Sequence, residues 1–416
     1  RIAIGAEVTM ATCVNCIAKL SESAGRAKFE GARMKPKILI GDGQLCLPCS
    51  ALLLTEKGIE QFKRGSRYIS RAIVKVDPVI DSPLRAADLH LRVRRLESTE
   101  QDFTDVGVLV AVGVLQVENR VFGSDQEAAA KTAEKFAIPN VCNSLEEMLA
   151  RKDVQIIDIA IHIEGRKEAF ELCAKAGKNV LLQKPVAHSY FDAKEYVRIA
   201  DENKIAYAVN QQARWAGTHL LIKRWIQGGA IGEVEFIRFD MSGWQDDPAT
   251  WYVKCPDFTL VDHGIHYFDL LRFFAGSDAL RVKAIQRRSR NQVNIAPTMY
   301  AAVVDFESGA IASHTFNNKV ETQEPWRMSI QVDGDEGSIE ADFNTVKLKR
   351  KDGTQIEHAP TSKWFPDAFL GPMSDLMDAI AERREPSISG KSNLGTMKLL
   401  MGALESAERG HAVHLK

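Results

Sequence analysis

The feature that most constrains the fold is an alternation of short apolar runs with helix-like segments between residues 106 and 214. The apolar runs have the length of strands and lie at 108–115, 154–161, 179–182 and 205–209. Helical patterns separate them at 125–136, 145–150, 167–176 and 191–203. Runs that are apolar throughout indicate strands buried on both faces, which is typical of parallel sheets built from right-handed β–α–β units. We therefore predict a Rossmann-like α/β domain with a parallel sheet over residues 106–214.

The pattern changes at residue 215, where strand-like segments begin to follow one another directly. Turn pairs such as Ser308-Gly309 and Glu336-Gly337 separate several of them. The expected strands are 234–241, 282–287, 300–306, 310–317, 328–332, 338–343 and 346–350, and the expected helices are 219–227, 261–274, 369–382 and 395–409. Successive strands joined by tight turns predict an antiparallel sheet. Residues 215–416 should therefore form an α+β domain for substrate binding and oligomerisation, with a large, mainly antiparallel sheet.

Two of these strands also bear on assembly. Residues 300–306 and 310–316 carry apolar side chains on both sides. A sheet of this kind needs cover on both faces or a polar outer face. We expect helices on one face and a second subunit on the other, which makes the chain a homo-oligomer.

Composition excludes several classes of protein. The formal net charge is −1, so no global field attracts the chain to nucleic acid or to an acidic membrane. No apolar run approaches the ~18 residues of a membrane-spanning helix. The seven cysteines are an odd number and no secretory signal pattern is visible, which favours a reducing, cytoplasmic location.

Paired cysteines mark the beginning of the chain. Cys13 and Cys16 form one C-x-x-C pair, and Cys46 and Cys49 form a second. A strand-like segment and the turn dipeptide Asp42-Gly43 precede the second pair. Four thiolates in two such pairs suit a tetrahedral Zn²⁺ ion, so residues 1–54 are predicted to form a zinc-ribbon-like module. Chance clustering and a redox pair are the alternatives.

The next segment, residues 55–105, has no clear periodicity and is interpreted as a linker or a poorly ordered segment. No glycine-rich strand–turn–helix precedes Val108, and the segment 41–46 follows a strand but lacks the third glycine of the fingerprint. The Rossmann-like domain is therefore predicted to be incomplete or atypical. A fused or shifted reading frame would explain both the cysteine-paired module at 1–54 and the segment 55–105, which has no clear periodicity and completes no glycine turn.

A first candidate for chemistry lies where the strand 179–182 ends in Gln183-Lys184-Pro185. In open α/β sheets the carboxyl ends of the strands line the ligand crevice. A partly desolvated lysine at that place can bind a substrate oxygen and favour its alkoxide form. Taken alone, the tripeptide is better explained by a lysine that faces water.

A second candidate is the pair Asp262 and His266 at the start of an apolar helix. Residues four apart share one helix face, so the carboxylate could orient the imidazole as a general base with a pKa near neutral. The equally good alternative is that Asp262 caps the helix and His266 is satisfied in the core.

Together, the two candidates resemble the glucose–fructose oxidoreductase / inositol dehydrogenase (Gfo/Idh/MocA) family over about residues 106–416. The matching motifs are Asn143-Ser144-Leu145-Glu146-Glu147-Met148-Leu149, Ala176-Gly177-Lys178, Gln183-Lys184-Pro185, Gly229-Ala230-Ile231-Gly232-Glu233-Val234, Asp262-His263-Gly264-Ile265-His266 and Leu270-Leu271-Arg272-Phe273-Phe274-Ala275-Gly276. The resemblance implies an NAD- or NADP-dependent oxidoreductase that moves a hydride between a sugar or polyol carbon and nicotinamide. It further implies that Lys184, Asp262 and His266 are catalytic. The residues it places near the cofactor are Gln183, Lys184, Pro185, Asn210, Gln212 and Arg214.

The chain also departs from the family pattern. Gln183 replaces the glutamate of the E-K-P motif, and Ile161–Arg166 replaces the T-P-N segment with its following histidine. The acidic residue that normally holds the adenosine ribose is expected near Val114, which cannot accept a hydrogen bond. The missing glycine loop supports an alternative function, a non-catalytic or degenerate member of the family whose zinc module binds a partner or nucleic acid.

Overall fold

The computed structural model describes residues 108–112, 120–123, 126–136, 138, 140–322 and 325–415. All of them belong to one compact unit, Leu91–Lys416. The predicted zinc ligands Cys13, Cys16, Cys46 and Cys49 and the predicted linker 55–105 lie outside the described residues, so both stay predictions.

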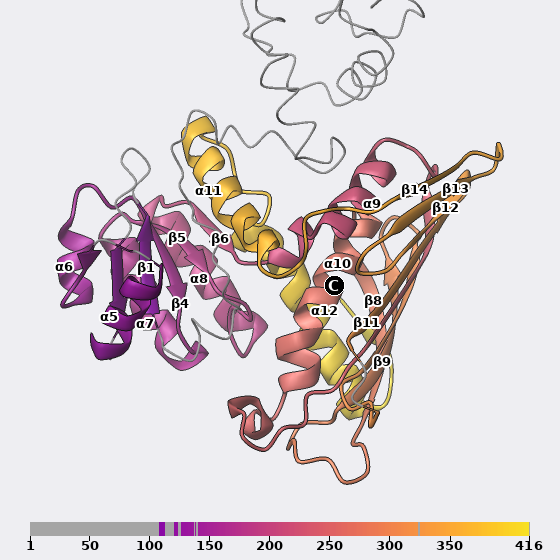
Figure 1. The fold of residues 1–416 in the computed structure, drawn as a ribbon, viewed down its shortest axis with the longest axis horizontal. Coiled ribbons are helices and arrows are strands. Elements are labelled where there is room, and N and C mark those ends of the chain that lie inside the picture. Colours follow the sequence, from indigo (N-terminus) through magenta and orange to yellow (C-terminus); the bar gives the residue numbers. More distant parts are fainter. Residues whose placement is uncertain are drawn as a thin grey trace, which may run out of the picture. The chain divides into compact units, whose positions relative to one another are not determined.

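The first half of the described chain is a Rossmann-like α/β domain (Figure 1). Its six-stranded sheet has the order β3-β2-β1-β4-β5-β6, which is the strand order of the dinucleotide-binding fold. The strands are β1 (Val108–Val112), β2 (Arg120–Gly123), β3 (Asn140–Val141), β4 (Ile156–Ala160), β5 (Asn179–Leu182) and β6 (Tyr207–Val209). The helices are α5 (Gln126–Phe136), α6 (Leu145–Ala150), α7 (Ile163–Lys175) and α8 (Tyr190–Asn203). The predicted fold class is therefore confirmed, and β4, β5 and β6 are parallel as expected.

Strand β1 differs from the prediction in its direction. It runs antiparallel to both of its neighbours, with Val110 opposite Val121 of β2 and opposite Asp158 of β4. Only residues 113–119 connect β1 to β2. A crossover between parallel strands takes at least ~10–12 residues, so this link is too short to carry a glycine turn and a helix. The prediction that 108–115 joins a fully parallel sheet is thus wrong for this strand.

The place of the acidic residue that would bind the adenosine ribose, expected near Val114, also differs from the prediction. The strand that lies beside β1 on the side away from β4 is β2, and it ends at Gly123. Glycine has no side chain that could accept a hydrogen bond from a ribose. The described end of this strand therefore offers no carboxylate to the adenosine ribose, and Asp125, two residues further on, lies outside the described residues.

Aromatic packing fixes the core of the Rossmann-like half. Phe170 of α7 contacts Tyr196 of α8 and Tyr207 of β6 edge to face, with ring centroids 4.9 and 4.8 Å apart. Ser189 caps α8 by accepting a hydrogen bond of 3.0 Å from the backbone N–H of Asp192. The ring contacts pack the two helices together and against β6.

The second half contains a nine-stranded sheet with the order β14-β13-β12-β11-β7-β10-β9-β8-β15. Its strands are β7 (Val234–Ser242), β8 (Ala279–Arg287), β9 (Met299–Phe306), β10 (Ile311–Asn317), β11 (Arg327–Gly334), β12 (Gly337–Ala341), β13 (Val346–Arg350), β14 (Gln355–His358) and β15 (Val413–His414). Every neighbouring pair is antiparallel except β7 and β10. The predicted large, mainly antiparallel sheet is confirmed.

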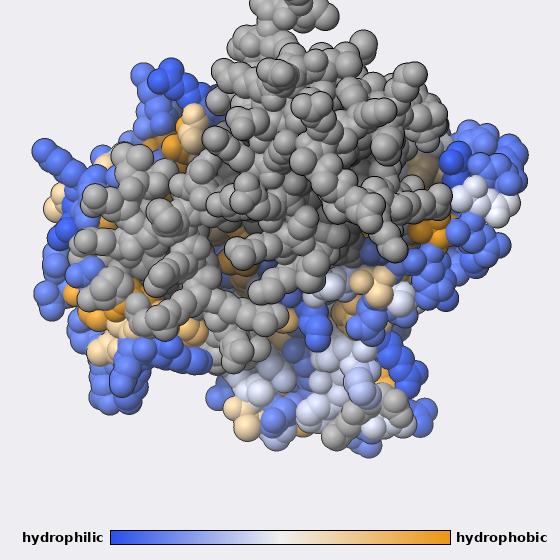
Figure 2. Space-filling model, turned by 45° about the horizontal axis from the view of Figure 1, so that its top comes forward, coloured by the Kyte–Doolittle hydropathy of each residue, from blue (hydrophilic) through white to orange (hydrophobic). Residues whose placement is uncertain are grey.

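Helices cover one face of this sheet (Figure 1). They are α9 (Gly217–Gln227), α10 (Gly264–Ala275) and α12 (Gly390–Arg409), while α11 (Leu370–Glu382) lies toward the Rossmann-like half. Strands β9 and β10 alternate accordingly, because Tyr300 and Phe316 are buried under the helices whereas Val303 is 52% exposed on the other face. On the face drawn in Figure 2, the described residues are mostly hydrophilic, with small apolar areas between them.

A buried ion pair ties the two halves together. Arg214, which follows β6, donates to both carboxylate oxygens of Asp269 in α10 at 2.6 and 2.7 Å. Thr396 of α12 donates a further hydrogen bond of 2.7 Å to Asp269.

In the part of the chain that the structure describes, no helix is both long and apolar enough to cross a membrane.

Candidate active site

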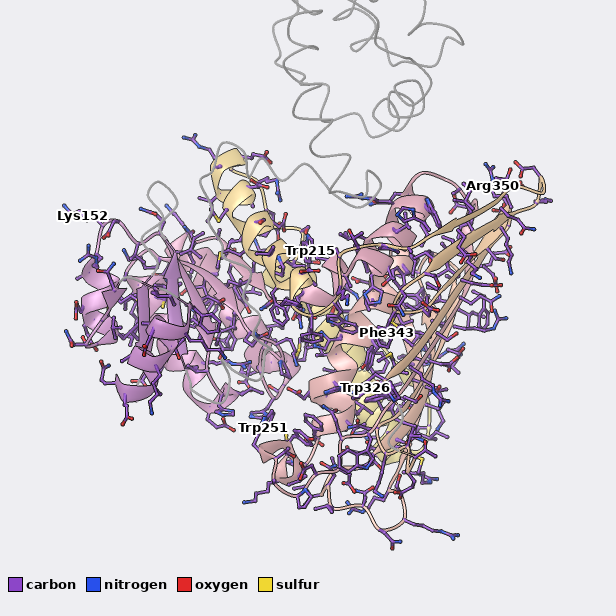
Figure 3. The ribbon with its side chains drawn as sticks, viewed as in Figure 1. Lys152, Trp215, Trp251, Trp326, Phe343 and Arg350 are labelled. Atoms are coloured by element: carbon purple, nitrogen blue, oxygen red, sulfur yellow. The ribbon has the colours of Figure 1, made fainter. Side chains whose placement is uncertain are left out.

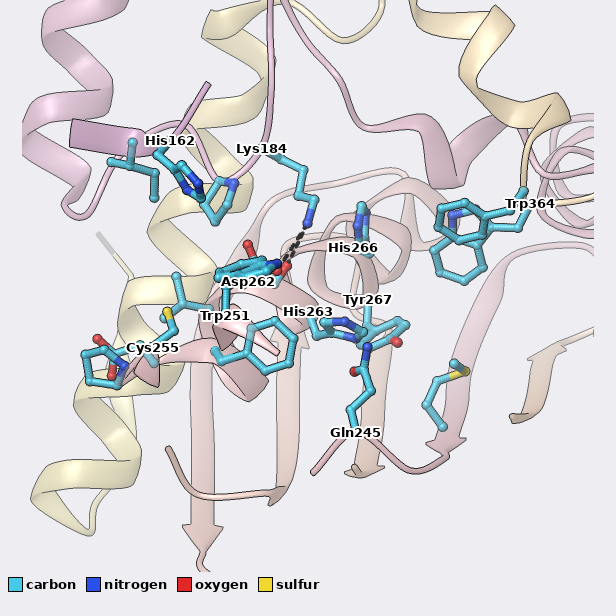
Figure 4. Close-up of a pocket in the computed structure, with 18 of the residues that line it drawn as sticks. His162, Lys184, Gln245, Trp251, Cys255, Asp262, His263, His266, Tyr267 and Trp364 are labelled. Atoms are coloured by element: carbon cyan, nitrogen blue, oxygen red, sulfur yellow. Dashed lines mark hydrogen bonds and ion pairs between the residues drawn. The ribbon is translucent and has the colours of Figure 1, made fainter. Parts of the chain in front are cut away.

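A pocket of about 810 Å³ lies beside the carboxyl ends of β4 and β5 and the beginning of α10. Its volume is in the upper part of the ~300–1,000 Å³ range of small-molecule sites. Lys184 and His266 both line it, so the two candidates found in the sequence converge on one cavity. Figure 4 shows them together with Asp262, which dashed lines join to Lys184.

Lys184 is placed by the turn that follows β5. Its side chain is 6% exposed, and its Nζ donates to the backbone oxygen of Asp262 at 3.2 Å and to the carboxylate Oδ2 at 3.4 Å. The side-chain oxygen of Gln183 accepts a hydrogen bond of 3.0 Å from the backbone N–H of Lys184. The structure therefore holds a buried ammonium group at the cavity wall, paired with a carboxylate.

Arg166 holds the backbone on both sides of this lysine. Its guanidinium donates to the backbone oxygens of Gln183 at 2.8 Å, of Pro185, and of Ile161 at 2.6 Å. Arg166 is 3% exposed and comes from α7, the helix between β4 and β5. It is the residue that replaces the family's histidine, and sequence reasoning did not assign it this function.

Asp262 does not pair with His266 in the way that the sequence suggested. Residues Phe258–His263 form a π-helical turn before α10. This wider turn changes the α-helical spacing on which the stacking of residues four apart depends. The carboxylate pairs with Lys184 instead, and Nδ1 of His266 is buried without a hydrogen-bond partner among the described residues. The expected orientation of His266 by Asp262 is replaced by a lysine–aspartate pair.

The surroundings of His266 favour the neutral imidazole. Burial lowers its pKa well below 6.5, and the charge of Lys184 lowers it further, followed by His263 and His219. The ring of Trp364 stands perpendicular to it, at 5.6 Å between centroids and 90°. A neutral imidazole can accept a proton at neutral pH, although its pKa is lower than the near-neutral value expected from the sequence.

Aromatic side chains form much of the remaining wall. Trp251, Trp326, Phe343 and Trp364 line the cavity, and Figure 3 places Trp326 and Phe343 beside the large sheet. Gln245, which follows β7, also lines it. These aromatic residues and Gln245 belong to segments without a recognisable motif, so no signal in a single sequence could have identified them.

Some of the residues predicted to bind the cofactor line the cavity, and others do not. Pro185 lines the cavity with Lys184, whereas Gln183, Asn210, Gln212 and Arg214 are buried and do not line it. Arg214 is engaged with Asp269, as described above. Contact of these residues with a cofactor stays a prediction.

Within the described ranges no group of three or more His, Cys, Asp or Glu side chains is arranged to hold a metal ion. Cys142, Cys173 and Cys255 are not in disulfide bonds.

Comparison with known proteins agrees with this architecture. Residues 116–211 match the model of the GFO/IDH/MocA oxidoreductase family with an NAD-binding Rossmann fold. Residues 219–340 match the model of a GFO/IDH/MocA C-terminal domain. The chain belongs to the GFO/IDH/MocA family. The first match begins at residue 116, after the end of β1.

Members of the family with assigned activities are among the relatives. The chain is 24% identical to D-apiose dehydrogenase of Paraburkholderia graminis over 70% of this chain and 81% of that protein. It is 24% identical to 1,5-anhydro-D-fructose reductase of Ensifer adhaerens over 75% of this chain and 94% of that protein. A solved oxidoreductase from Agrobacterium radiobacter, in complex with NAD⁺, L-tartaric acid and magnesium, shares the fold with a TM-score of 0.66 and 23% identity over 71% of this chain and 90% of that one.

Proposed function

We propose that this GFO/IDH/MocA member is an NAD(P)-dependent oxidoreductase that transfers a hydride between a hydroxyl-bearing carbon of a sugar or polyol and nicotinamide. The observation that carries the proposal is the convergence of a buried lysine and a neutral, buried histidine on one cavity at the carboxyl ends of β4 and β5. The relatives named dehydrogenase or reductase of sugars support the substrate class.

The described residues fit one end of the cofactor. The cavity reaches from the strand ends at His162 and Lys184 to the aromatic wall, which leaves room for a nicotinamide ring beside a substrate ring. The cradle for the pyrophosphate normally comes from the turn between the first strand and its helix. The seven residues between β1 and β2 are too few for such a turn and its helix, so the described residues account for the nicotinamide end alone.

The protein's own groups then act as follows. His266 accepts the proton of the substrate hydroxyl as its carbon is oxidised. The ammonium of Lys184 stabilises the negative charge that develops on the oxygen, and Asp262 holds that ammonium in place. The nicotinamide, when bound, accepts the hydride.

The direct test is a screen of neutral sugars and polyols with the full chain and either NAD⁺ or NADP⁺. Absorbance of the reduced nicotinamide is the readout. We expect at least one ring-form sugar to be oxidised. If no sugar or polyol reacts in either direction, the degenerate alternative is favoured, which the short β1–β2 link supports.

Arg166 provides the first mutational prediction. Arg166→Met removes the donors that hold the carbonyl groups on both sides of Lys184. Displacement of a catalytic group by about 1 Å can cost ~10²-fold in rate, so kcat should fall by about 10–10²-fold. The control is Arg198→Met, because Arg198 bridges Glu195 and Glu202 on the exposed surface of α8. A wild-type kcat for Arg166→Met would show that the clamp is dispensable.

Assembly is the second prediction. On the face of the large sheet that no described helix covers, Ile285, Val303 and Ile311 are 49%, 52% and 42% exposed. Burial of such residues against a second copy would remove apolar surface from water. We expect light scattering to give the mass of a dimer or larger oligomer at micromolar concentration, and Val303→Asp to lower it. A strict monomer for the wild type would contradict this arrangement.

A further inference from the structure

A second histidine, His263, lies beside the proposed catalytic one. His263 has helical backbone angles at the start of α10, and it lies three residues before His266. It is the last residue of the π-helical turn, and its ring lines the cavity together with that of His266. Figure 4 shows both imidazoles next to the Lys184–Asp262 pair.

The ring of His263 is held in a stack of aromatic side chains. It is nearly parallel to Phe316 at 5.7 Å and 7°, and to Trp326 at 5.8 Å and 19°. Its Nδ1 atom is buried and has no hydrogen-bond partner in the described part of the chain. Burial lowers the pKa of His263 to about 4, so the ring is neutral at physiological pH. A neutral imidazole has one donor and one acceptor nitrogen, as a hydroxyl group requires.

Two further uncharged side chains of the cavity wall also have a buried polar atom without a hydrogen-bond partner among the described residues. The side-chain oxygen of Gln245 and the indole N–H of Trp364 are buried in the cavity wall without partners among the described residues. A buried polar atom left unpaired costs about 1–3 kcal/mol, so a ligand that satisfies these atoms is favoured.

The charged side chains that line the cavity are either exposed or already engaged with other groups. Glu164, Asp257 and Lys363 line the cavity but are exposed. The buried cations are engaged, because Lys184 pairs with Asp262 and Arg166 donates to backbone carbonyl groups. A carboxylate on the substrate would be desolvated against tryptophan rings, and the remaining cation of the wall, Lys363, is exposed and therefore offers only a solvent-screened pairing.

From this arrangement we infer that His263 binds the hydroxyl group next to the reacting one, and that the pocket selects an uncharged sugar ring with neighbouring hydroxyl groups. Gln245 and Trp364 bind further hydroxyl groups of the same ring. The inference rests on the proposed function, since it assigns the recognition residues of that same site.

The experiment uses a neutral sugar oxidised by the wild type, its mono-deoxy analogues and its uronate. For the wild type, one deoxy analogue should lose about 10²-fold or more in kcat/KM, because a buried polar group is then left unpaired. The uronate should be a poorer substrate than the neutral sugar. His263→Phe keeps the stack but removes the nitrogen atoms. It should lower kcat/KM for the parent sugar and bring the ratio of parent to deoxy analogue close to one.

Two further variants complete the design. His263→Gln, which restores a donor and an acceptor, should recover part of the ratio. His188→Phe alters an exposed histidine at the cavity mouth and should keep the wild-type ratio. If the wild type tolerates every deoxy analogue, prefers the uronate, or keeps its ratio in His263→Phe, the inference is overturned while the proposed function stands. If no sugar is oxidised at all, both are overturned.

Discussion

Replacing Lys184 by alanine should lower kcat by about 10³-fold while leaving the fold intact, because the variant loses the charge that stabilises the developing alkoxide. The side chain of Lys184 is 6% exposed, and that of Asp262, the carboxylate with which it pairs, is 22% exposed. Water can therefore solvate Asp262 in the variant, so the free energy of unfolding should change little. The measurement is steady-state kinetics with the best sugar, alongside urea unfolding.

A matched control lies at the other end of the same strand. Lys178 precedes β5, is 8% exposed, and donates to the backbone oxygens of Arg151 at 2.6 Å and Val154 at 2.8 Å. Lys178→Met should lower the free energy of unfolding by about 1–3 kcal/mol through these lost hydrogen bonds, with kcat nearly unchanged. Equal kinetic effects of the two lysine variants would mean that Lys184 acts only through the structure.

Acid should destabilise this protein steeply between pH 6.5 and about 4. Burial lowers the pKa of His219, His263 and His314 to about 4, and that of His266 well below 6.5. In this window the unfolded chain binds protons that the folded chain does not, so stability falls as the pH falls. One buried carboxyl, Asp158, opposes the effect, because burial raises its pKa to about 7 and the folded state takes up its proton first.

In this window the unfolded chain holds four more protons on these histidines, and the folded chain holds one more on Asp158. The unfolded chain therefore binds three more protons in total. Each proton corresponds to about 1.4 kcal/mol per pH unit, so the free energy of unfolding should fall by about 4 kcal/mol between pH 6 and pH 5. Urea unfolding at the two pH values measures this slope. His219→Gln should reduce it by about a third, whereas His411→Gln, at an exposed position, should not. A pH-independent free energy of unfolding would contradict the neutral, buried state of these rings.

The sequence was informative where periodicity and turns act locally. The parallel strands β4, β5 and β6, the mainly antiparallel sheet that contains β7 to β13 and the convergence of Lys184 with His266 could all be predicted, whereas the parallel pairing of β7 with β10 could not. Short strands such as β2 and β14 could not, because four residues carry too little periodicity. The direction of β1 depends on the length of its link to β2, which requires knowing where β2 begins.

Side-chain partners were predicted less well than their positions. The spacing of Asp262 and His266 assumed an α-helix, and the π-helical turn redirects the carboxylate to Lys184. Arg166 was noticed as a departure from a motif, but its contacts with Gln183 and Pro185 depend on tertiary structure. Long-range pairings of this kind have no local signal in one sequence.

The account depends most on the ability of this chain to hold a nicotinamide cofactor without a glycine turn between β1 and β2. Nicotinamide fluorescence measures this directly, by titrating NADH or NADPH into the full chain. We expect enhanced emission that saturates with at least one of them, with half-saturation below about 1 mM. Emission that only grows in proportion to added cofactor, for both NADH and NADPH, would contradict the proposal that this chain is a working oxidoreductase.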